Sequence, residues 1–219
     1  MTPSAILFGS IGTLVETSEL QRAAFNAAFV EQGLDWVWDQ DTYRAMLVVP
    51  GGRGRIQAFA ELSGIDVDAE ALHARKTALF DTAIIERGLH LRPGVADVID
   101  RAMDKGVKLG FCTTTSRANI DAIFTALSGE LNRAAFDFIS EARAGLPPKP
   151  DSAVYHEALR ALKLTATEAI AVEDSAGNLV APQVAGIRVI AFPGENTSND
   201  PFLGAVDVVK ELKPSLFGL

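Results

Sequence analysis

Short apolar runs alternate with helical patterns along most of the chain, and this alternation constrains the fold more than any other feature. Apolar runs typical of buried strands lie at 4–8, 107–112, 136–140, 169–173 and 187–192, with 205–209 as a further candidate. Helical spacing of apolar residues separates them at 94–105, 116–127, 151–163 and 176–184. Strands that alternate with helices in this way predict an α/β fold, in which helices cover both faces of a parallel sheet.

The segment 17–88 departs from this alternation, because it has helical patterns and no convincing strand. We expect helices at 19–33, 39–49, 52–63 and 68–87. The first strand fits the sheet by composition, so the helical segment is inserted after it. This predicts an α/β core made of 1–16 and 89–219, and a helical domain at 17–88. Ligands of parallel sheets bind at the carboxyl ends of the strands, where the insertion begins, so it would form a lid.

The composition is that of an ordinary globular protein, with 48% apolar and 22% charged residues in 219. The 28 acidic and 20 basic residues give a net charge of -8, which argues against nucleic acid as a partner. No apolar run is long enough to span a membrane, and the first residues lack a signal-peptide pattern, so we expect the protein in the cytoplasm. We also expect it to be a monomer. Cys112 is the only cysteine, which excludes an internal disulfide and a cysteine zinc site.

Three segments that follow strands carry candidate chemistry. Gly9–Thr13 lacks the spacing of a dinucleotide turn and the lysine of a phosphate-binding loop, so taken alone it indicates a structural turn. Thr113–Ser116 offers four hydroxyl groups at a helix start, which suits either a phosphate or simple capping of that helix. Glu173 and Asp174 end another strand, where paired carboxylates suit either magnesium or a favourable helix start.

A fourth segment lies in the helical region, where Arg53 and Arg55 follow a pair of glycines. Two guanidinium groups there would suit a phosphate, and the alternative is a solvated loop before a helix. His73, His90 and His156 lack the spacing of metal ligands, and we expect each of them at the surface.

Taken together, these segments resemble the haloacid dehalogenase-like (HAD) hydrolase superfamily, and within it the CbbY-like branch of sugar-phosphate phosphatases. The resemblance covers nearly the whole chain, and its short motifs are specific in their joint order and spacing. It implies a Rossmann-like HAD core with an inserted all-helical cap. The residues that carry it are Ala5–Phe8, Gly12–Leu14, Glu19–Leu20, Arg22, Ala24–Asn26, Gly33–Trp36, Gly51–Gly52, Arg55, Leu91–Gly94, Thr113–Ser116, Pro148, Pro150, Asp151, Glu173–Ser175 and Gly177.

The resemblance also implies a mechanism. Members of the family begin with the motif D-x-D-G-T, whose first Asp attacks phosphorus and forms an aspartyl-phosphate. The second Asp protonates the leaving sugar oxygen and later activates water. A Thr or Ser after the second motif strand holds a phosphoryl oxygen, a Lys balances charge, and carboxylates of the last motif hold magnesium.

This chain departs from the family pattern at the residues that perform the chemistry. Gly9 stands at the nucleophile position and Ile11 at the acid/base position, and neither side chain can take that role. The pattern K-P-x-P-D aligns with 147–151, which puts Pro147 at the lysine position and Lys149 two residues later. Gln21 stands where the branch usually has His.

Binding residues are better preserved than catalytic ones. The resemblance leaves Asp174, Glu173 and the backbone carbonyl of Ile11 for a metal, so we expect magnesium binding to be weak or absent. Thr114 is the expected phosphate contact, and Arg55 is the expected cap contact to a distal phosphate. The full set expected to bind substrate is Thr114, Thr115, Arg55, Arg53, Glu16 and Lys149.

The leading hypothesis is a HAD-like homologue that has lost phosphatase activity and still binds a small phosphorylated sugar. Loss of a covalent nucleophile costs several powers of ten in rate, which favours this hypothesis. The first alternative is a working or weakly working magnesium-dependent phosphatase with a surrogate group, for which Ser10 and Glu16 are poorly placed candidates. The second alternative is a non-enzymatic interaction protein.

Overall fold

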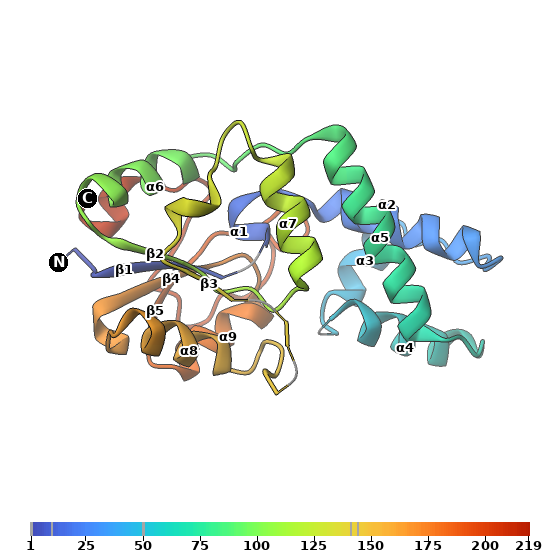
Figure 1. Ribbon diagram of the computed structural model, residues 1–219. Coiled ribbons are helices and arrows are strands. Elements are labelled where there is room, and N and C mark those ends of the chain that lie inside the picture. The colour runs from blue at the N-terminus through green and yellow to red at the C-terminus, as the bar shows by residue number, and fades with distance from the viewer. Residues whose placement is uncertain (1, 10, 50, 141, 144) are drawn as a thin grey trace.

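The computed structural model describes residues 2–9, 11–49, 51–140, 142–143 and 145–219. Within these residues, parallel strands form one six-stranded sheet in the order β3-β2-β1-β4-β5-β6 (Figure 1). The predicted parallel α/β sheet is therefore confirmed. The strands are β1 (Ala5–Phe8), β2 (Lys108–Phe111), β3 (Phe138–Ile139), β4 (Ala169–Glu173), β5 (Arg188–Ala191) and β6 (Asp207–Val208).

The central strand β1 alternates its side chains between the two faces of the sheet. Ile6 and Phe8 pack into one hydrophobic core, whereas Ala5 and Leu7 pack into the other. All four are fully buried, as expected for a strand that is covered on both faces. The register pairs Phe8 with Phe111 of β2, and β4 pairs in parallel on the other side, so the three strands end side by side.

Helices cover both faces, and two of them begin next to the carboxyl ends of the strands. α6 (Val95–Asp104) and α7 (Arg117–Ala126) lie over one face, and α8 (Ala153–Leu162) and α9 (Ala176–Val184) over the other (Figure 1). Ser116 caps α7 and Ser175 caps α9, because each hydroxyl accepts a hydrogen bond from a backbone N–H three residues later. Short 3₁₀ turns lie at Arg133–Ala135, Ala166–Glu168 and Pro214–Phe217.

The segment between β1 and α6 is helical and lies beside the sheet rather than over it (Figure 1). After the single-turn helix α1 (Ile11–Leu14) come α2 (Ser18–Glu31), α3 (Gln40–Met46), α4 (Gly52–Ser63) and α5 (Ala69–Arg87). These four longer helices, here called the helical block, share an aromatic core that includes Phe25, Phe29, Trp36, Trp38 and Tyr43. Buried aromatic side chains supply much of the energy that holds such helices together.

The chain leaves the sheet and returns to it at neighbouring points. Val15 and Leu91 form an isolated antiparallel bridge, and the backbone N–H of Arg92 donates to the carbonyl of Leu14 at 2.8 Å. Two neighbouring chain connections therefore join the helical block to the sheet, at the edge where β1 ends. Within the described ranges, none of the helices combines the length and apolar character needed to cross a bilayer.

The two outer strands are shorter than the sequence predicts. The run 136–140 forms a strand only at Phe138–Ile139, and the run 205–209 only at Asp207–Val208. Both are edge strands, which can pair on one side only, so fewer of their residues gain ladder hydrogen bonds.

Candidate functional site

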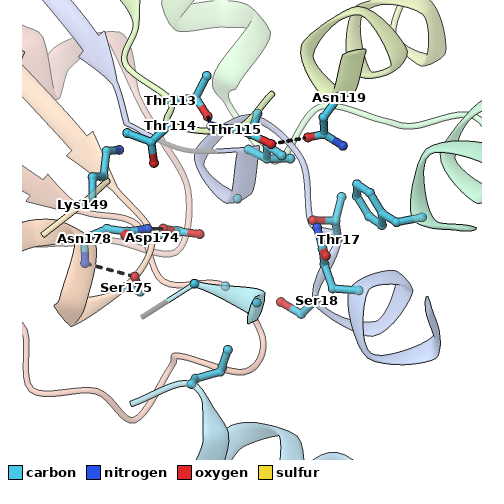
Figure 2. Close-up of a pocket in the computed structure, with 18 of the residues that line it drawn as sticks. Thr17, Ser18, Thr113, Thr114, Thr115, Asn119, Lys149, Asp174, Ser175 and Asn178 are labelled. Atoms are coloured by element: carbon cyan, nitrogen blue, oxygen red, sulfur yellow. Dashed lines mark hydrogen bonds between the residues drawn. The ribbon is translucent and has the colours of Figure 1, made fainter. Parts of the chain in front are cut away.

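A cleft of about 560 Å³ lies between the carboxyl ends of the strands and the helical block. Its core side is formed by the segments that follow β1, β2 and β4, which meet because these strands are neighbours in the sheet. In Figure 2, Thr113, Thr114 and Thr115 lie in the upper part of the view, Lys149 lies at the left and Asp174 lies below them. Three of the segments singled out from the sequence therefore meet in one place.

Lys149 lies on the floor of the cleft and is buried. Its ammonium group donates hydrogen bonds to the backbone carbonyl of Gly9 and to Glu173 Oε1, the second at 2.6 Å. The Tyr155 hydroxyl donates to the same carboxylate oxygen at 2.6 Å. Burial raises the pKa of Glu173, and the Lys149 ammonium opposes that rise. The structure brings Lys149 into the cleft, whereas Pro147 is exposed and does not line it.

Positions 9 and 11 line the cleft without a carboxyl group. A β-carbon added at Gly9 would overlap the carboxyl group of Glu173, which fills the space beside the glycine. Ile11 begins α1, and its backbone carbonyl accepts a hydrogen bond from the N–H of Val15 at 3.0 Å. Ser10, considered above as a surrogate nucleophile, lies outside the described residues.

The residues of the hydroxyl-rich segment Thr113–Ser116 have different roles. Ser116 caps α7, and Thr115 donates its hydroxyl to Asn119 Oδ1 at 3.0 Å. Asn119 in turn donates its side-chain amide to Asp81 on α5, which links the core to the helical block. Capping therefore occupies Ser116, while the Thr114 side chain faces the cleft (Figure 2). Hydroxyl groups and free backbone N–H groups at a helix start suit an anion.

Asp174 is the acidic side chain of the last motif that lines the cleft. One of its oxygens accepts a hydrogen bond from the Asn178 side-chain amide at 3.1 Å. Its backbone carbonyl accepts from the Thr197 hydroxyl at 2.6 Å, which ties this strand end to the loop after β5. Glu173, one residue earlier, points into the core, because adjacent residues of a strand face opposite ways.

The helical block contributes positive charge to the opposite side of the cleft. Arg55 lines it, and its Nε donates to the backbone carbonyl of Val49 at 3.0 Å. Lys76 also lines it, with its ammonium group 4.7 Å from the ring centre of Phe25, and it donates a hydrogen bond to Gln21. Burial lowers the pKa of Lys76 to about 7, and the positive charge of Arg55 adds to this effect.

Sequence reasoning missed Lys76 and placed His73 at the surface. His73 lines the cleft instead, and burial lowers its pKa to about 4. A signal for Lys76 was present, because it lies on the buried stripe of α5 between Leu72 and Phe80 at four-residue spacing. A lysine is rarely buried on the apolar stripe of a helix unless its charge pairs with another protein group or with a ligand.

Two residues expected to bind substrate have other partners. Arg53 is exposed outside the cleft and lies 3.6 Å from Glu70 of α5. Glu16 lines the cleft, but its two carboxylate oxygens accept hydrogen bonds from the backbone N–H groups of Ser18 and Glu195, each at 2.8 Å. These contacts give Glu16 a structural role between the core and the helical block.

Comparison with known proteins identifies the family. Residues 3–186 match the family model of the haloacid dehalogenase-like hydrolases. The chain belongs to this family. It is 40% identical over 204 residues to the protein CbbY of Cereibacter sphaeroides, which covers 92% of this chain and 89% of that protein. The predicted resemblance to the HAD hydrolases and to CbbY is therefore confirmed.

Solved structures support the same assignment. CbbY from Rhodobacter sphaeroides, in a variant form in complex with xylulose-(1,5)bisphosphate, is 38% identical with a TM-score of 0.87, and the match covers 95% of this chain and 94% of that one. β-Phosphoglucomutase from Clostridium difficile is 15% identical with a TM-score of 0.77 over 98% and 95% of the two chains, which supports the fold alone. HAD hydrolases generally use Mg²⁺.

Proposed function

We propose that this member of the HAD family binds a phosphorylated sugar in the cleft and does not hydrolyse it through an aspartyl-phosphate. The observation that carries this proposal is the floor of the cleft at Gly9. There the family's nucleophile is replaced by a glycine, and the nearest carboxylate, Glu173, is fully buried and held by Lys149 and Tyr155.

The distribution of donors supports a ligand with two anionic ends. Thr114 and Lys149 lie on the core side, and Arg55 and Lys76 lie on the side of the helical block. Cations and hydroxyl groups at both ends of a cleft suit a molecule with a phosphate at each end. A CbbY relative at 38% identity binds xylulose-(1,5)bisphosphate, which makes a sugar bisphosphate the first ligand to test.

The loss of hydrolysis follows from the groups that remain. A nucleophile must reach the phosphorus, and the carboxylate nearest to Gly9, that of Glu173, is fully buried. Ile11 cannot protonate a leaving oxygen, and both oxygens of Glu16 are occupied by backbone N–H groups. Removal of the covalent nucleophile of an enzyme typically lowers kcat by about four to six powers of ten.

We extend the proposal to the domain organisation. Residues 17–88 act as a cap that covers the ligand, and 1–16 with 89–219 act as the core that holds its reacting phosphate. The cleft between the two is lined from both sides, which supports this division.

The test combines calorimetry with a phosphate-release assay, both with xylulose 1,5-bisphosphate. We expect binding without phosphate release above the level of an Asp174→Asn variant, which reveals contaminating phosphatase. The Thr114→Val variant should lose most of the affinity, whereas Thr125→Val, on an exposed position of α7, should keep it. Phosphate release that disappears in Asp174→Asn would show a working phosphatase, and absence of binding would contradict the proposed ligand.

A further inference from the structure

The cleft floor holds an ion pair where a metal-dependent relative needs an open carboxylate. Glu173 is fully buried, and its Oε1 accepts hydrogen bonds from both Lys149 and Tyr155 at 2.6 Å. Its second oxygen, Oε2, has no hydrogen-bond partner within the described residues and is sealed from solvent. The carboxyl group lies where the β-carbon of any residue other than glycine at position 9 would be.

The other groups expected to bind a metal are only partly available for it. The carbonyl of Ile11 accepts the N–H of Val15 inside α1. Asp174 is the one carboxylate of this motif that lines the cleft, and one of its two oxygens accepts a hydrogen bond from Asn178. The described residues contain no group of three or more His, Cys, Asp or Glu side chains that could hold a metal ion. This set fits Mg²⁺ poorly, since the ion needs nearly octahedral oxygen ligands.

The charges at the floor of the cleft also disfavour a bound metal. A family member with two aspartates at positions 9 and 11 places negative charge beside the incoming phosphate, and a divalent cation offsets that repulsion. Here both positions are uncharged, and the Lys149 ammonium already neutralises Glu173. A phosphate therefore meets less negative charge and gains less from a metal.

We propose that the Lys149–Glu173 ion pair takes the place of the divalent cation, so that this chain binds phosphate esters without metal. The proposal rests on the proposed function, because it describes how the same cleft holds the same class of ligand. The glycine at position 9 is required for it, since a larger residue would push the Glu173 carboxylate away from Lys149.

The first experiment measures metal binding without any sugar. Mn²⁺ serves as a probe, because bound Mn²⁺ loses the sharp paramagnetic resonance signal of the free ion. We expect the free signal to be unchanged by millimolar concentrations of this protein. Micromolar binding of Mn²⁺ that disappears in Asp174→Asn would overturn the proposal.

The second experiment separates this proposal from the proposed function. Calorimetry with xylulose 1,5-bisphosphate is run once with EDTA and once with MgCl₂. Equal affinity, within twofold, supports both proposals. Binding that occurs only with Mg²⁺ overturns the metal-free site and leaves the ligand class standing, and absence of binding under both conditions overturns the proposed function itself.

The Gly9→Asp/Ile11→Asp double variant supplies the matched comparison. The new carboxylates should displace Glu173 from Lys149, create Mn²⁺ binding, and make the affinity for the sugar bisphosphate depend on metal. If the double variant binds sugar bisphosphate as the unaltered chain does and still binds no Mn²⁺, the proposed link between position 9 and the metal is wrong.

A simpler pair of variants tests the packing on which the proposal depends. Gly9→Ala should lower the melting temperature, because its β-carbon overlaps the Glu173 carboxyl group. In a Glu173→Ala background the same change should lower it much less. An equal loss in both backgrounds would show that Glu173 does not occupy the space beside Gly9.

Discussion

Lys76 illustrates how a single buried charge can set the ligand preference of a cleft. It lies between Leu72 and Phe80 on the buried stripe of α5, and its ammonium group lies over the rings of Phe25 and Phe80. Its hydrogen bond goes to the neutral Gln21, and the charge of Asp81 offsets only part of the effect of burial on its pKa. A buried ammonium group that is only partly compensated is costly, and an anionic ligand would lower that cost.

This environment predicts a pH dependence of binding. Burial lowers the pKa of Lys76 to about 7, so the free protein loses this charge as the pH rises above 7. A bound anion favours the charged form and raises that pKa. The affinity for a sugar bisphosphate should therefore fall between pH 7 and 9, by up to about tenfold per pH unit, as the cost of protonating Lys76 grows.

Calorimetry at several pH values, in buffers of different ionisation enthalpy, checks this prediction through the number of protons taken up on binding. The Lys76→Met variant should bind more weakly and lose most of the pH dependence. Lys105→Met, at an exposed position after α6, is the matched control and should behave as the unaltered chain. Constant affinity from pH 7 to 9 would contradict a role for Lys76 in anion binding.

Among the elements, the loop after β5 fastens the helical block to the core. Asn196 in this loop is buried, and its side-chain oxygen accepts a hydrogen bond from Arg44 Nε of α3 at 2.9 Å. Its amide nitrogen donates to Glu19 of α2 at 3.2 Å. One side chain therefore connects two helices of the block to the loop after β5.

The Asn196→Ala variant should loosen this connection without unfolding the core. Loss of two partly buried hydrogen bonds to charged groups costs about 2–4 kcal/mol locally. We expect faster amide hydrogen exchange in α3 and weaker ligand binding, while exchange in β1 and β4 stays slow. Asn132→Ala, which removes the cap of a 3₁₀ turn outside the cleft lining, serves as the control. Uniformly faster exchange would show that Asn196 supports global stability instead.

In the molecule as a whole, Arg92 lies where the chain returns from the helical block to the sheet. Its guanidinium group donates hydrogen bonds to the backbone carbonyls of Gly12, Phe192 and Pro193, and it lies 3.4 Å from the ring centre of Phe192. These carbonyls belong to the turn after β1 and to the loop after β5. A single planar group thus binds two chain segments that approach each other only in the folded state.

The Arg92→Lys variant should lower the free energy of unfolding by about 2–4 kcal/mol, since a lysine cannot bond three carbonyls in one plane and leaves buried acceptors unpaired. Urea unfolding followed by circular dichroism measures the loss. The exposed Arg101→Lys change on α6 should cost less than about 0.5 kcal/mol. Similar losses for both variants would contradict the role of Arg92 as a structural centre.

Much of the fold was predictable because its signals are local. The apolar run at 4–8 and the period of 94–105 reflect which side chains fit a strand or a helix, and neighbouring residues decide that. The edge strands were overestimated, because their length depends on pairing at one side only. His73 was misplaced for a related reason, since its depth depends on how α5 packs against the rest of the block.

The amino-acid sequence was enough to predict the parallel sheet, because a strand and a helix differ in the period of their apolar residues. It also indicated the family through the order and spacing of its motifs, and it shows directly that positions 9 and 11 carry no acidic side chain. The contact of Lys149 with Gly9, 140 residues earlier in the sequence, became visible only in the folded chain, as did the position of Glu173 in the space beside Gly9. Such contacts form because loops that are distant in the sequence meet at the ends of neighbouring strands, and no local sequence pattern specifies which loops will meet.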